Sequence, residues 1–230
     1  MGRLLLVGNS RWHWAERAAG GLRVWHENGP PAAAVPWGDL EAWACVGTLP
    51  QDALLPEQRR IGLQQLPLQH MPPWLGIDRA LTGWQAWRQQ SGGVLVADAG
   101  TCLSLTCIDE QGCFRGGRLS AGLALQLRSL AEGTAQLPAV QPGAEAMERM
   151  DSWPVETAAA MAQGCLRACA AAVLQGWRDL GGDGHGQLWL TGGDAVQLEP
   201  LLRREGLQPV LAPNLALEAL AALAGDQPLS

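Results

Sequence analysis

Two short segments place a carboxylate beside groups that can bind an anion. The first is Asp98-Ala99-Gly100-Thr101, which follows the apolar run Val94–Ala97, a pattern typical of a strand buried on both faces. Gly100 allows the backbone to approach a ligand closely, and the Thr101 hydroxyl and nearby amides can donate hydrogen bonds to an anion. We therefore expect Asp98 and Thr101 to face one polar pocket. The alternative is that Asp98 only caps a turn.

The second segment is Gly76-Ile77-Asp78-Arg79. Pro72 and Pro73 precede it and cannot lie in a helix interior, so we expect a loop that opens a helix over Ala80–Gln90. An adjacent carboxylate and guanidinium suit the binding of an acidic, hydroxylated small molecule. The alternative is structural, because Asp78 could simply be the N-cap of that helix and Arg79 a solvated residue of its first turn.

The N-terminus repeats the scheme of the first segment. Leu4–Ser10 is an apolar strand followed by a glycine and small polar residues, and a second strand begins near Arg11. Aligning Gly8 with Gly100 places Leu6 opposite Asp98, so this copy lacks the carboxylate. Two such units about half a chain apart predict a duplicated α/β domain with a ligand between the halves. We expect these halves at residues 1–92 and 93–230.

The other elements are predicted from periodicity, turns and cap residues. Strands are expected over Cys102–Ile108 and Cys113–Leu119, joined by the turn Asp109–Gly112, and over Leu22–His26, Trp43–Gly47 and Gln187–Leu190. Helices are expected over Leu49–Arg60, from Ser120 to about Glu132, from Ser152 to about Asp179 with Thr157 in the first turn, over Pro213–Gly225, and after Asp39 and Asp194 as caps. The glycine turn Thr191–Asp194 could approach a phosphate or an adenosine.

The composition excludes several classes of protein. The 230 residues carry a formal net charge of -6, and the 16 Lys+Arg residues are all Arg. Without Lys the chain is neither a P-loop NTPase nor a protein kinase, because both need a Lys on the nucleotide phosphates. No basic block favours a nucleic-acid partner, and no signal peptide or run of about 18 apolar residues favours a membrane. We expect a cytoplasmic protein.

The cysteines point to structure rather than to chemistry. They are Cys45, Cys102, Cys107, Cys113, Cys165 and Cys169. None has CxxC spacing, so we expect small buried thiols in preference to disulfides or zinc ligands.

Seven motifs in one order resemble those of the type III pantothenate kinases, which belong to the acetate kinase, sugar kinase, Hsp70 and actin superfamily. Here the motifs are Gly8-Asn9-Ser10, Gly76-Ile77-Asp78-Arg79, Asp98-Ala99-Gly100-Thr101, Gly116-Gly117, Thr134-Ala135-Gln136-Leu137-Pro138, Thr157 and Thr191-Gly192-Gly193-Asp194-Ala195. They run from near one end of the chain to the other. The resemblance implies an α/β fold of duplicated actin-like (ribonuclease H-like) domains, with mixed sheets flanked by helices.

The same resemblance implies a function and a set of roles. The activity would be ATP-dependent phosphorylation of pantothenate to 4'-phosphopantothenate, the first step of coenzyme A synthesis. Asp78 would be the general base; Gly76, Ile77, Asp78, Arg79 and Thr157 would hold pantothenate; Leu6, Val7, Gly8, Asn9, Ser10, Arg11, Trp12, His13 and Thr101 would hold ATP; and Asp98 would bind K+ or ammonium. Mg2+ would neutralise the phosphates, and the long helix with Thr157 would make a homodimer.

Two positions depart from the resembling family. Leu6 stands where its first loop usually carries an Asp that helps to hold hydrated Mg2+, and His13 stands where it usually carries a Lys. His13 could contact a phosphate when protonated, or it could be an edge-strand residue that faces water. The missing carboxylate leaves a second hypothesis open, in which the chain is a catalytically inactive protein that binds nucleotide or pantothenate and acts as a regulator.

Overall fold

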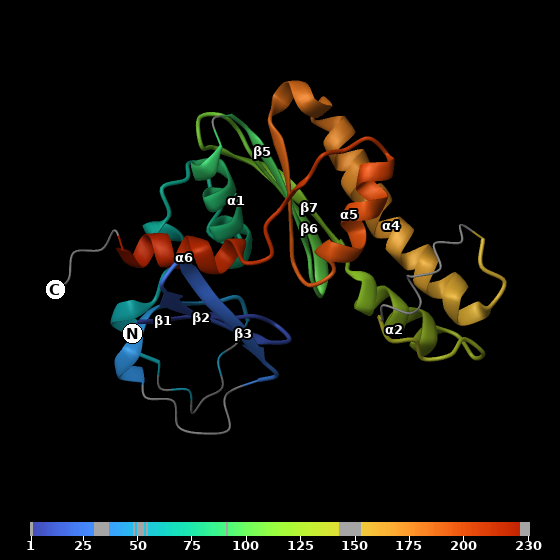
Figure 1. Cartoon of the computed structure of the whole chain (residues 1–230), viewed down its shortest axis with the longest axis horizontal. Helices are drawn as coiled ribbons and strands as arrows, with labels where there is room; N and C mark the ends of the chain where they lie inside the picture. The colour runs from blue at the N-terminus through green and yellow to red at the C-terminus, as the bar shows by residue number, and fades with distance from the viewer. Residues whose placement is uncertain are drawn as a thin grey trace. The chain divides into compact units, whose positions relative to one another are not determined.

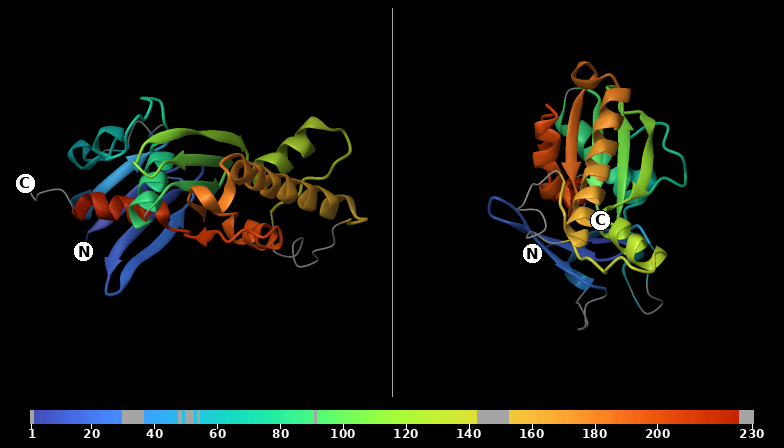
Figure 2. Two further views of the ribbon diagram at one scale, coloured as in Figure 1. Left: turned by 90° about the horizontal axis from the view of Figure 1, so that it is seen from above. Right: turned by 90° about the vertical axis from the view of Figure 1, so that its right-hand side faces the viewer.

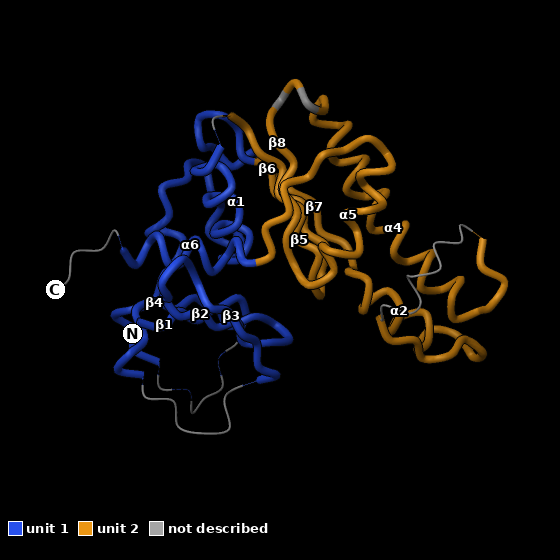
Figure 3. Tube along the Cα trace, viewed as in Figure 1, with its two compact units in different colours: residues 1–91, 108–115, 214–230 blue, residues 92–107, 116–213 orange. Residues whose placement is uncertain are grey.

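The computed structural model describes residues 2–29, 37–47, 49, 53, 55–90, 92–142 and 153–225. The chain forms two compact units, coloured separately in Figure 3. Unit 1 comprises Met1–Ser91, Ile108–Arg115 and Asn214–Ser230, and unit 2 comprises Gly92–Cys107 and Gly116–Pro213. The predicted halves also meet near residue 92, but they assign the C-terminal segment to the second half, whereas it belongs to unit 1 here. The division into functional domains stays a prediction.

Unit 1 is built on a four-stranded sheet in the order β3-β2-β1-β4 (Figure 1). Its strands are β1 (Arg3–Val7), β2 (Trp12–Ala18), β3 (Gly21–Glu27) and β4 (Leu40–Cys45). β2 is antiparallel to both β1 and β3, and β4 is parallel to β1. The turn between β2 and β3 uses Gly20, whose φ of 103° suits glycine. This turn sets the register, in which Ala18 lies opposite Gly21 and His13 lies opposite His26.

The two faces of this sheet differ because side chains alternate along each strand. One face is aromatic, and Trp14 stacks there between Trp25 and Trp37 with ring centroids 6.0 and 6.3 Å apart. The buried members of this cluster are Leu5, Val7, Trp12, Trp14, Leu40 and Trp43. The intervening residues Leu4, Leu6, Ala15, Ala42 and Ala44 are buried as well. All five are small or unbranched at Cβ, which lets helices approach the opposite face closely.

Two helices complete unit 1. α1 (Ile77–Gln89) and α6 (Leu215–Gly225) pack against each other, and α6 also packs on β1, β2 and β4. The Arg17 guanidinium donates to the Ala221 carbonyl at 2.6 Å and pairs with Glu41 at 2.9 Å, which ties the end of α6 to the sheet. Three short 3-10 turns, η1 (Trp37–Asp39), η2 (Glu57–Arg59) and η3 (Leu63–Gln65), lie in the connections.

Unit 2 contains most of a five-stranded sheet in the order β7-β6-β5-β8-β9. The strands are β5 (Val94–Ala99), β6 (Cys102–Ile108), β7 (Phe114–Ala121), β8 (Gln187–Thr191) and β9 (Val210–Leu211). β8 runs parallel to both of its neighbours, β5 and β9. The order of β7, β6, β5 and β8 repeats that of β3, β2, β1 and β4 in unit 1. The duplication predicted from the loops at Gly8 and Gly100 is therefore present in the topology.

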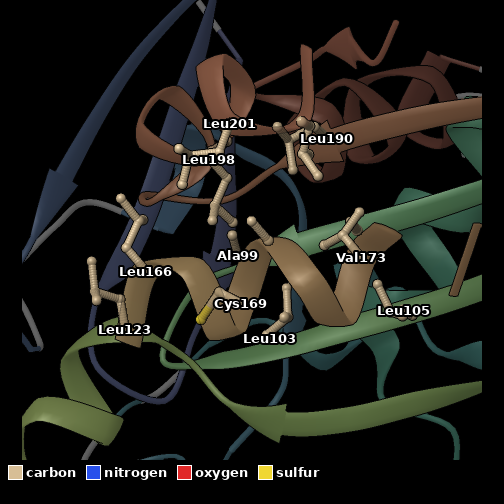
Figure 4. Close-up of a cluster of buried hydrophobic side chains, with 14 of the residues drawn as sticks. Ala99, Leu103, Leu105, Leu123, Leu166, Cys169, Val173, Leu190, Leu198 and Leu201 are labelled. Carbon is tan, nitrogen blue, oxygen red and sulfur yellow. The ribbon is translucent and has the colours of Figure 1, made fainter. Parts of the chain in front are cut away.

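Helices α2 (Leu123–Gly133), α4 (Thr157–Asp179) and α5 (Ala195–Arg204) bury one face of this sheet. Leu103 and Leu105 of β6 meet Cys169 and Val173 of α4 in this core, as Figure 4 shows. α2 packs beside α4, which Figure 2 shows from two directions. A short 3-10 turn, η4 (Gly182–His185), follows α4.

By length and composition alone, α4 is apolar enough to cross a membrane. One side of it, including Met161, Leu166, Val173 and Trp177, is buried in the core of unit 2. The core helix of a globular protein passes the same test. The core contacts account for the apolar character of α4.

Several predicted elements differ in the structure. The helix predicted over Leu49–Arg60 is wrong among the described residues of that stretch, where only η2 is helical. The Ile61 amide instead donates to the Trp43 carbonyl at 2.7 Å, so the segment after η2 is extended beside β4. Asp39 ends η1 and caps no helix, because β4 begins at Leu40. The long helix begins at Thr157; Ser152 lies outside the described residues. β9 is an additional strand that the sequence reading missed.

Candidate active site

The carboxyl end of β5 carries Asp98 in unit 2. Asp98 is half-buried and lies opposite Thr191 in the parallel register of β5 and β8, so the ends of the two strands meet here. After β5 the chain turns sharply, because the Gly100 amide donates to the Cys102 carbonyl at 3.1 Å. Thr101, at the tip of this turn, is exposed. The carboxylate and the hydroxyl therefore belong to one rigid turn at the edge of the unit.

Two glycines from distant segments close around this turn. Gly192 has a φ of 93°, and a Cβ there would overlap the Ala99 carbonyl and lie 2.5 Å from Asp98 Oδ1. A Cβ at Gly122 would overlap the Gly100 carbonyl, and the Gly122 amide donates to the Thr101 carbonyl at 3.0 Å. Only residues without a side chain fit at these two positions. The Asp98 carboxylate consequently lies against bare backbone.

Two helices also begin at this turn. Gly122 is the N-cap of α2 and Asp194 is the N-cap of α5, and the Asp194 amide donates to the Ala99 carbonyl at 2.9 Å. Helix N-termini favour anions, so this edge of unit 2 is suited to phosphate oxygens. Beneath the turn the side chains are apolar, and the hollow that they leave has no room for a water molecule; Figure 4 shows Ala99, Leu123, Leu166, Cys169 and Leu198 around it.

The structure does not bring Thr157 into this group. It is the first residue of α4 and is exposed. Leu166, which contacts the floor of the Asp98 turn, lies about 13 Å further along the helix axis, at 1.5 Å per residue. Any substrate contact of Thr157 is separate from the groups at Asp98.

In unit 1 the loop after β1 is tight and polar. The Gly8 amide donates to the Arg11 carbonyl at 2.9 Å, and the Val46 amide donates to the Val7 carbonyl at 2.9 Å. The residues between, Asn9 and Ser10, are exposed, as is Arg11. The predicted ATP-binding residues Leu6, Val7 and Trp12, in contrast, are 7%, 2% and 4% exposed. Their side chains are buried in the hydrophobic core, so only their backbone atoms could contact a ligand.

His13 does not match either of the environments predicted for it. Its strand, β2, lies between β3 and β1 and is not an edge strand. Burial, then the neighbouring His26 and Arg11, lower the pKa of His13 to about 4. His13 is therefore neutral at pH 7, and the prediction that it contacts phosphate as a cation is not supported by its surroundings.

Asp78 lies in the first turn of α1 and is not its N-cap. Gly76 is the N-cap, and the Gly76 carbonyl accepts the first helical hydrogen bond, from the Ala80 amide at 3.1 Å. Asp78 Oδ1 accepts from the Arg79 amide at 2.9 Å, and a Cβ at Gly76 would lie 2.6 Å from the same oxygen. The carboxylate thus folds back over Gly76. The structural alternative in which Asp78 caps the helix is wrong.

Asp78 and Arg79 are both partly withdrawn from water, which affects their electrostatics. Burial raises the pKa of Asp78, and the Arg79 amide and the Arg79 charge oppose this shift without cancelling it. Arg79 is half-buried, and its Nε is buried without a hydrogen-bond partner among the described residues. Arg79 is therefore not a solvated residue. The Arg79 Nε is thus a buried donor next to the partly desolvated Asp78 carboxylate. This combination is typical of a site that binds a polar ligand.

Metal ions can be considered from the donors that are present. Among the residues that the structure describes, no three His, Cys, Asp or Glu side chains gather to hold a metal. Mg2+ commonly binds through one or two carboxylates together with substrate phosphates, so it would depend here on the nucleotide. The Asp98 carboxylate lies beside the backbone of Gly192, and a carboxylate next to backbone carbonyls fits a weakly held monovalent cation. None of the six cysteines, all of which are among the described residues, forms a disulfide, and Cys102 is exposed, unlike the buried thiol expected.

Sequence reasoning did not predict how three residues contribute to these sites. Gly122 and Gly192 close on Asp98 from other segments, and only the positive φ of Gly192 follows from a local turn signal, the Gly192-Gly193 pair. His26 pairs with His13. This pairing could have been predicted by counting residues back along both strands from the turn at Gly20.

Comparison with known proteins identifies the family. The sequence profile described as "Type III pantothenate kinase" matches residues 57–179, a stretch that includes Gly76–Arg79, Asp98–Thr101 and Thr157. A type III pantothenate kinase of Synechococcus elongatus is 36% identical over 226 residues, which cover 88% of this chain and 88% of that protein. These matches cover both units.

Solved structures of low identity share the fold. A Campylobacter jejuni protein assigned to the Baf family of transcriptional activators has a TM-score of 0.61 at 16% identity, over 97% of each chain. The activator of the 2-hydroxyisocaproyl-CoA dehydratase from Clostridium difficile, solved with bound ADPNP, has a TM-score of 0.54 at 11% identity, over 100% of this chain and 99% of that chain. The duplicated actin-like fold expected from the sequence is confirmed. By sequence, the chain belongs to the type III pantothenate kinase family.

Proposed function

We propose that this protein catalyses the ATP-dependent phosphorylation of pantothenate to 4'-phosphopantothenate, the first step of coenzyme A synthesis. The observation that carries the proposal is the family membership of the chain, in which the matched stretch contains Gly76–Arg79, Asp98–Thr101 and Thr157. The half-buried Asp78 and the glycine-lined turn at Asp98 agree with phosphoryl transfer to a small acceptor.

The acceptor would bind at the start of α1. Asp78 would act as general base: the primary hydroxyl of pantothenate attacks the γ-phosphorus, its proton passes to the Asp78 carboxylate, and ADP leaves with the electrons of the broken bond. A carboxylate with a raised pKa is a better proton acceptor than an ordinary one. Arg79, whose Nε has no hydrogen-bond partner among the described residues, would bind the substrate carboxylate, and Gly76, Ile77 and Thr157 would complete the pantothenate site.

ATP would bind through backbone and small polar groups, since the chain has no Lys. In unit 1 the contacts would come from the loop Gly8–Arg11, except for the Gly8 amide, which already donates to the Arg11 carbonyl, and from His13 at the base of the loop. Leu6, Val7 and Trp12 would contribute backbone atoms only. In unit 2 the donors are Thr101 and the amides at the starts of α2 and α5. When bound, Mg2+ would neutralise charge on the phosphates; this chain has Leu6 where a carboxylate ligand would otherwise stand, so the nucleotide itself would hold the ion.

Asp98 would hold K+ or ammonium beside the phosphates. Its carboxylate lies against the bare backbone of Gly192, where carbonyl and phosphate oxygens can share a large monovalent cation. We predict that the rate rises with K+ or ammonium and not with Na+ alone. Rates measured in the three chloride salts at matched ionic strength check this, and equal rates would remove Asp98 from the role.

The proposed assembly is a homodimer in the cytoplasm, formed through α4. Trp153 and Val155 precede α4 and are 88% and 95% exposed, and aromatic side chains such as Trp are enriched in protein–protein interfaces. Neither nucleic acid nor a membrane is a proposed partner.

The product identifies the reaction. Incubation of the protein with ATP, Mg2+, K+ and pantothenate should yield ADP and a pantothenate phosphomonoester, observed by phosphorus NMR and mass spectrometry. A pantothenate analogue without the primary hydroxyl is the matched control and should yield no phosphomonoester. Phosphorylation of that analogue, or no phosphomonoester from pantothenate itself, would contradict the proposal.

A further inference from the structure

Two imidazoles of unit 1 lie at the base of the loop after β1. His13 on β2 and His26 on β3 are directly opposite each other in the antiparallel register. Their Nδ1 atoms are 3.0 Å apart, and the rings meet edge to face with centroids 4.8 Å apart. At this distance the two nitrogens share one hydrogen, because two bare nitrogens or two N–H groups would repel each other.

The second nitrogen of His13 points to the loop. A Cβ placed on Gly8 would lie 3.3 Å from His13 Nε2 and 2.9 Å from the Arg11 carbonyl. The Gly8 amide already donates to that carbonyl, so it is not available to a ligand. The Nε2 edge of His13 therefore lies directly against the turn whose other side chains, Asn9 and Ser10, are exposed.

A neutral imidazole can donate a hydrogen bond from Nε2 to an anion in only one of its two tautomers. With Nε2–H it donates a hydrogen bond, whereas with Nδ1–H its Nε2 lone pair faces the anion and repels it. His13 is half-buried and neutral, as described above, so its tautomer decides which case holds. The partner of Nδ1 decides the tautomer in turn. That partner is His26.

We propose that His26 is a positioning residue whose Nδ1–H donates to His13 Nδ1 and thereby directs the His13 Nε2–H at the phosphate oxygens of a bound nucleoside triphosphate. The inference rests on the proposed assignment of the loop Gly8–Arg11 to the phosphates of ATP. It explains how a neutral side chain at this place can bind a phosphate, and it gives a task to an exposed histidine on the outer strand of the sheet.

The tautomer can be measured without any enzyme activity. Nitrogen-proton correlation spectra of the imidazoles, recorded on the full chain without nucleotide near pH 7, distinguish protonated from bare ring nitrogens. Spectra of His13→Gln and His26→Gln assign the signals. We expect a proton on Nε2 and none on Nδ1 of His13, and a proton on Nδ1 of His26. The reverse arrangement would overturn the proposal.

The positioning role predicts a particular kinetic pattern. His26→Ala should raise the KM for ATP about 3- to 10-fold and change kcat by less than about twofold, since a weakened hydrogen bond to a charged group has an effect of this order. His26→Gln, whose amide can still donate to His13 Nδ1, should stay within about twofold of the wild type. The matched control is His70→Asn; His70 is exposed and its φ of 58° is tolerated by Asn.

A double mutant tests whether His26 acts through His13. In the background of His13→Gln, the further change His26→Ala should have no effect on the KM for ATP, because the group that it positions is already gone. An unchanged KM in His26→Ala alone, or an effect that adds fully to that of His13→Gln, would overturn the proposal. Absence of ATP turnover in the wild type would instead refute the proposed function. The tautomer measurement does not depend on activity, so it distinguishes this outcome from a failure of the present proposal.

Discussion

At the scale of single residues, burial has more influence than neighbouring charge on the candidate groups. Burial raises the pKa of Asp78 in spite of the adjacent Arg79 guanidinium. Burial likewise lowers the pKa of His13 to about 4. In both cases the loss of hydration disfavours the charged form; at Asp78 the Arg79 amide and charge oppose this effect, whereas at His13 the neighbouring His26 and Arg11 add to it. A sequence shows which charges are adjacent but not how much water remains around them.

Asp78→Asn should separate catalysis from stability. The amide oxygen of Asn can still accept from the Arg79 amide, and Gly76 remains the N-cap of α1, so the helix should form as before. The proton acceptor is lost, and kcat should fall by at least ~10²-fold with a nearly unchanged melting temperature. Steady-state kinetics and thermal unfolding measure the two quantities. Asp39→Asn, which removes an exposed carboxylate from the same unit, is the control and should keep its rate.

The pH dependence of the wild-type rate gives a second test of whether Asp78 is the general base. The base must be deprotonated, and its pKa is raised, so kcat/KM should begin to fall at a higher pH than an ordinary carboxylate would produce. A variant that keeps its rate as Asn, or an acid limb at the ordinary carboxyl pKa, would mean that Asp78 is not the base.

His13 should make the folded state sensitive to acid. Its pKa is about 4 when folded and 6.5 in the reference state, so the unfolded chain binds more protons between these values and stability falls as the pH drops through that window. Between pH 7 and pH 5 the free energy of unfolding should decrease by about 1 kcal/mol on account of His13, which is less than the full shift implies because solvent screens the half-buried ring. Urea unfolding at both pH values measures this. In His13→Gln the decrease should be smaller by that amount; an equal decrease in both proteins would contradict the assignment.

At the scale of elements, the site at Asp98 is made by strand ends and helix starts that fit only around glycine. β5 and β8 end together, and α2 and α5 begin beside them through Gly122 and Asp194. The apolar floor formed with α4 fixes this arrangement from below (Figure 4). Because each contact joins segments far apart in sequence, adding one methyl group at a contact should displace both the neighbouring backbone and the Asp98 carboxylate.

Gly192→Ala tests this close fit, and the next residue supplies the control. The added Cβ would be strained at a φ of 93° and would displace the Ala99 carbonyl and Asp98 Oδ1. We expect a loss of about 2–4 kcal/mol in the free energy of unfolding and a weaker response of the rate to K+. Gly193→Ala should change neither, because a Cβ there meets nothing within 4 Å. Equal behaviour of the two variants in denaturant titrations would refute the fit described.

At the scale of the whole molecule, the sequence predicts connectivity better than it predicts site geometry. The strands over 94–99 and 102–108 were predictable because continuous β-branched runs end at Gly and Asp-Gly turns. Among the described residues of Leu49–Arg60 only η2 is helical, because the pairing of Ile61 with Trp43 outweighs local helix preference. The candidate residues of the site could also be predicted from the sequence. The packing of Gly122 and Gly192 around the Asp98 turn, and the pairing of His26 with His13, could not, because they depend on tertiary contacts that no local pattern records.

The most direct test of the account is the rate of ADP release by the purified chain as pantothenate is varied. At saturating ATP, Mg2+ and K+, the account predicts release that rises with pantothenate to a plateau and is near zero without it. An ATPase rate that does not depend on pantothenate, or no ADP release at any pantothenate concentration from folded protein, would contradict the central claim that this member of the family is an active pantothenate kinase.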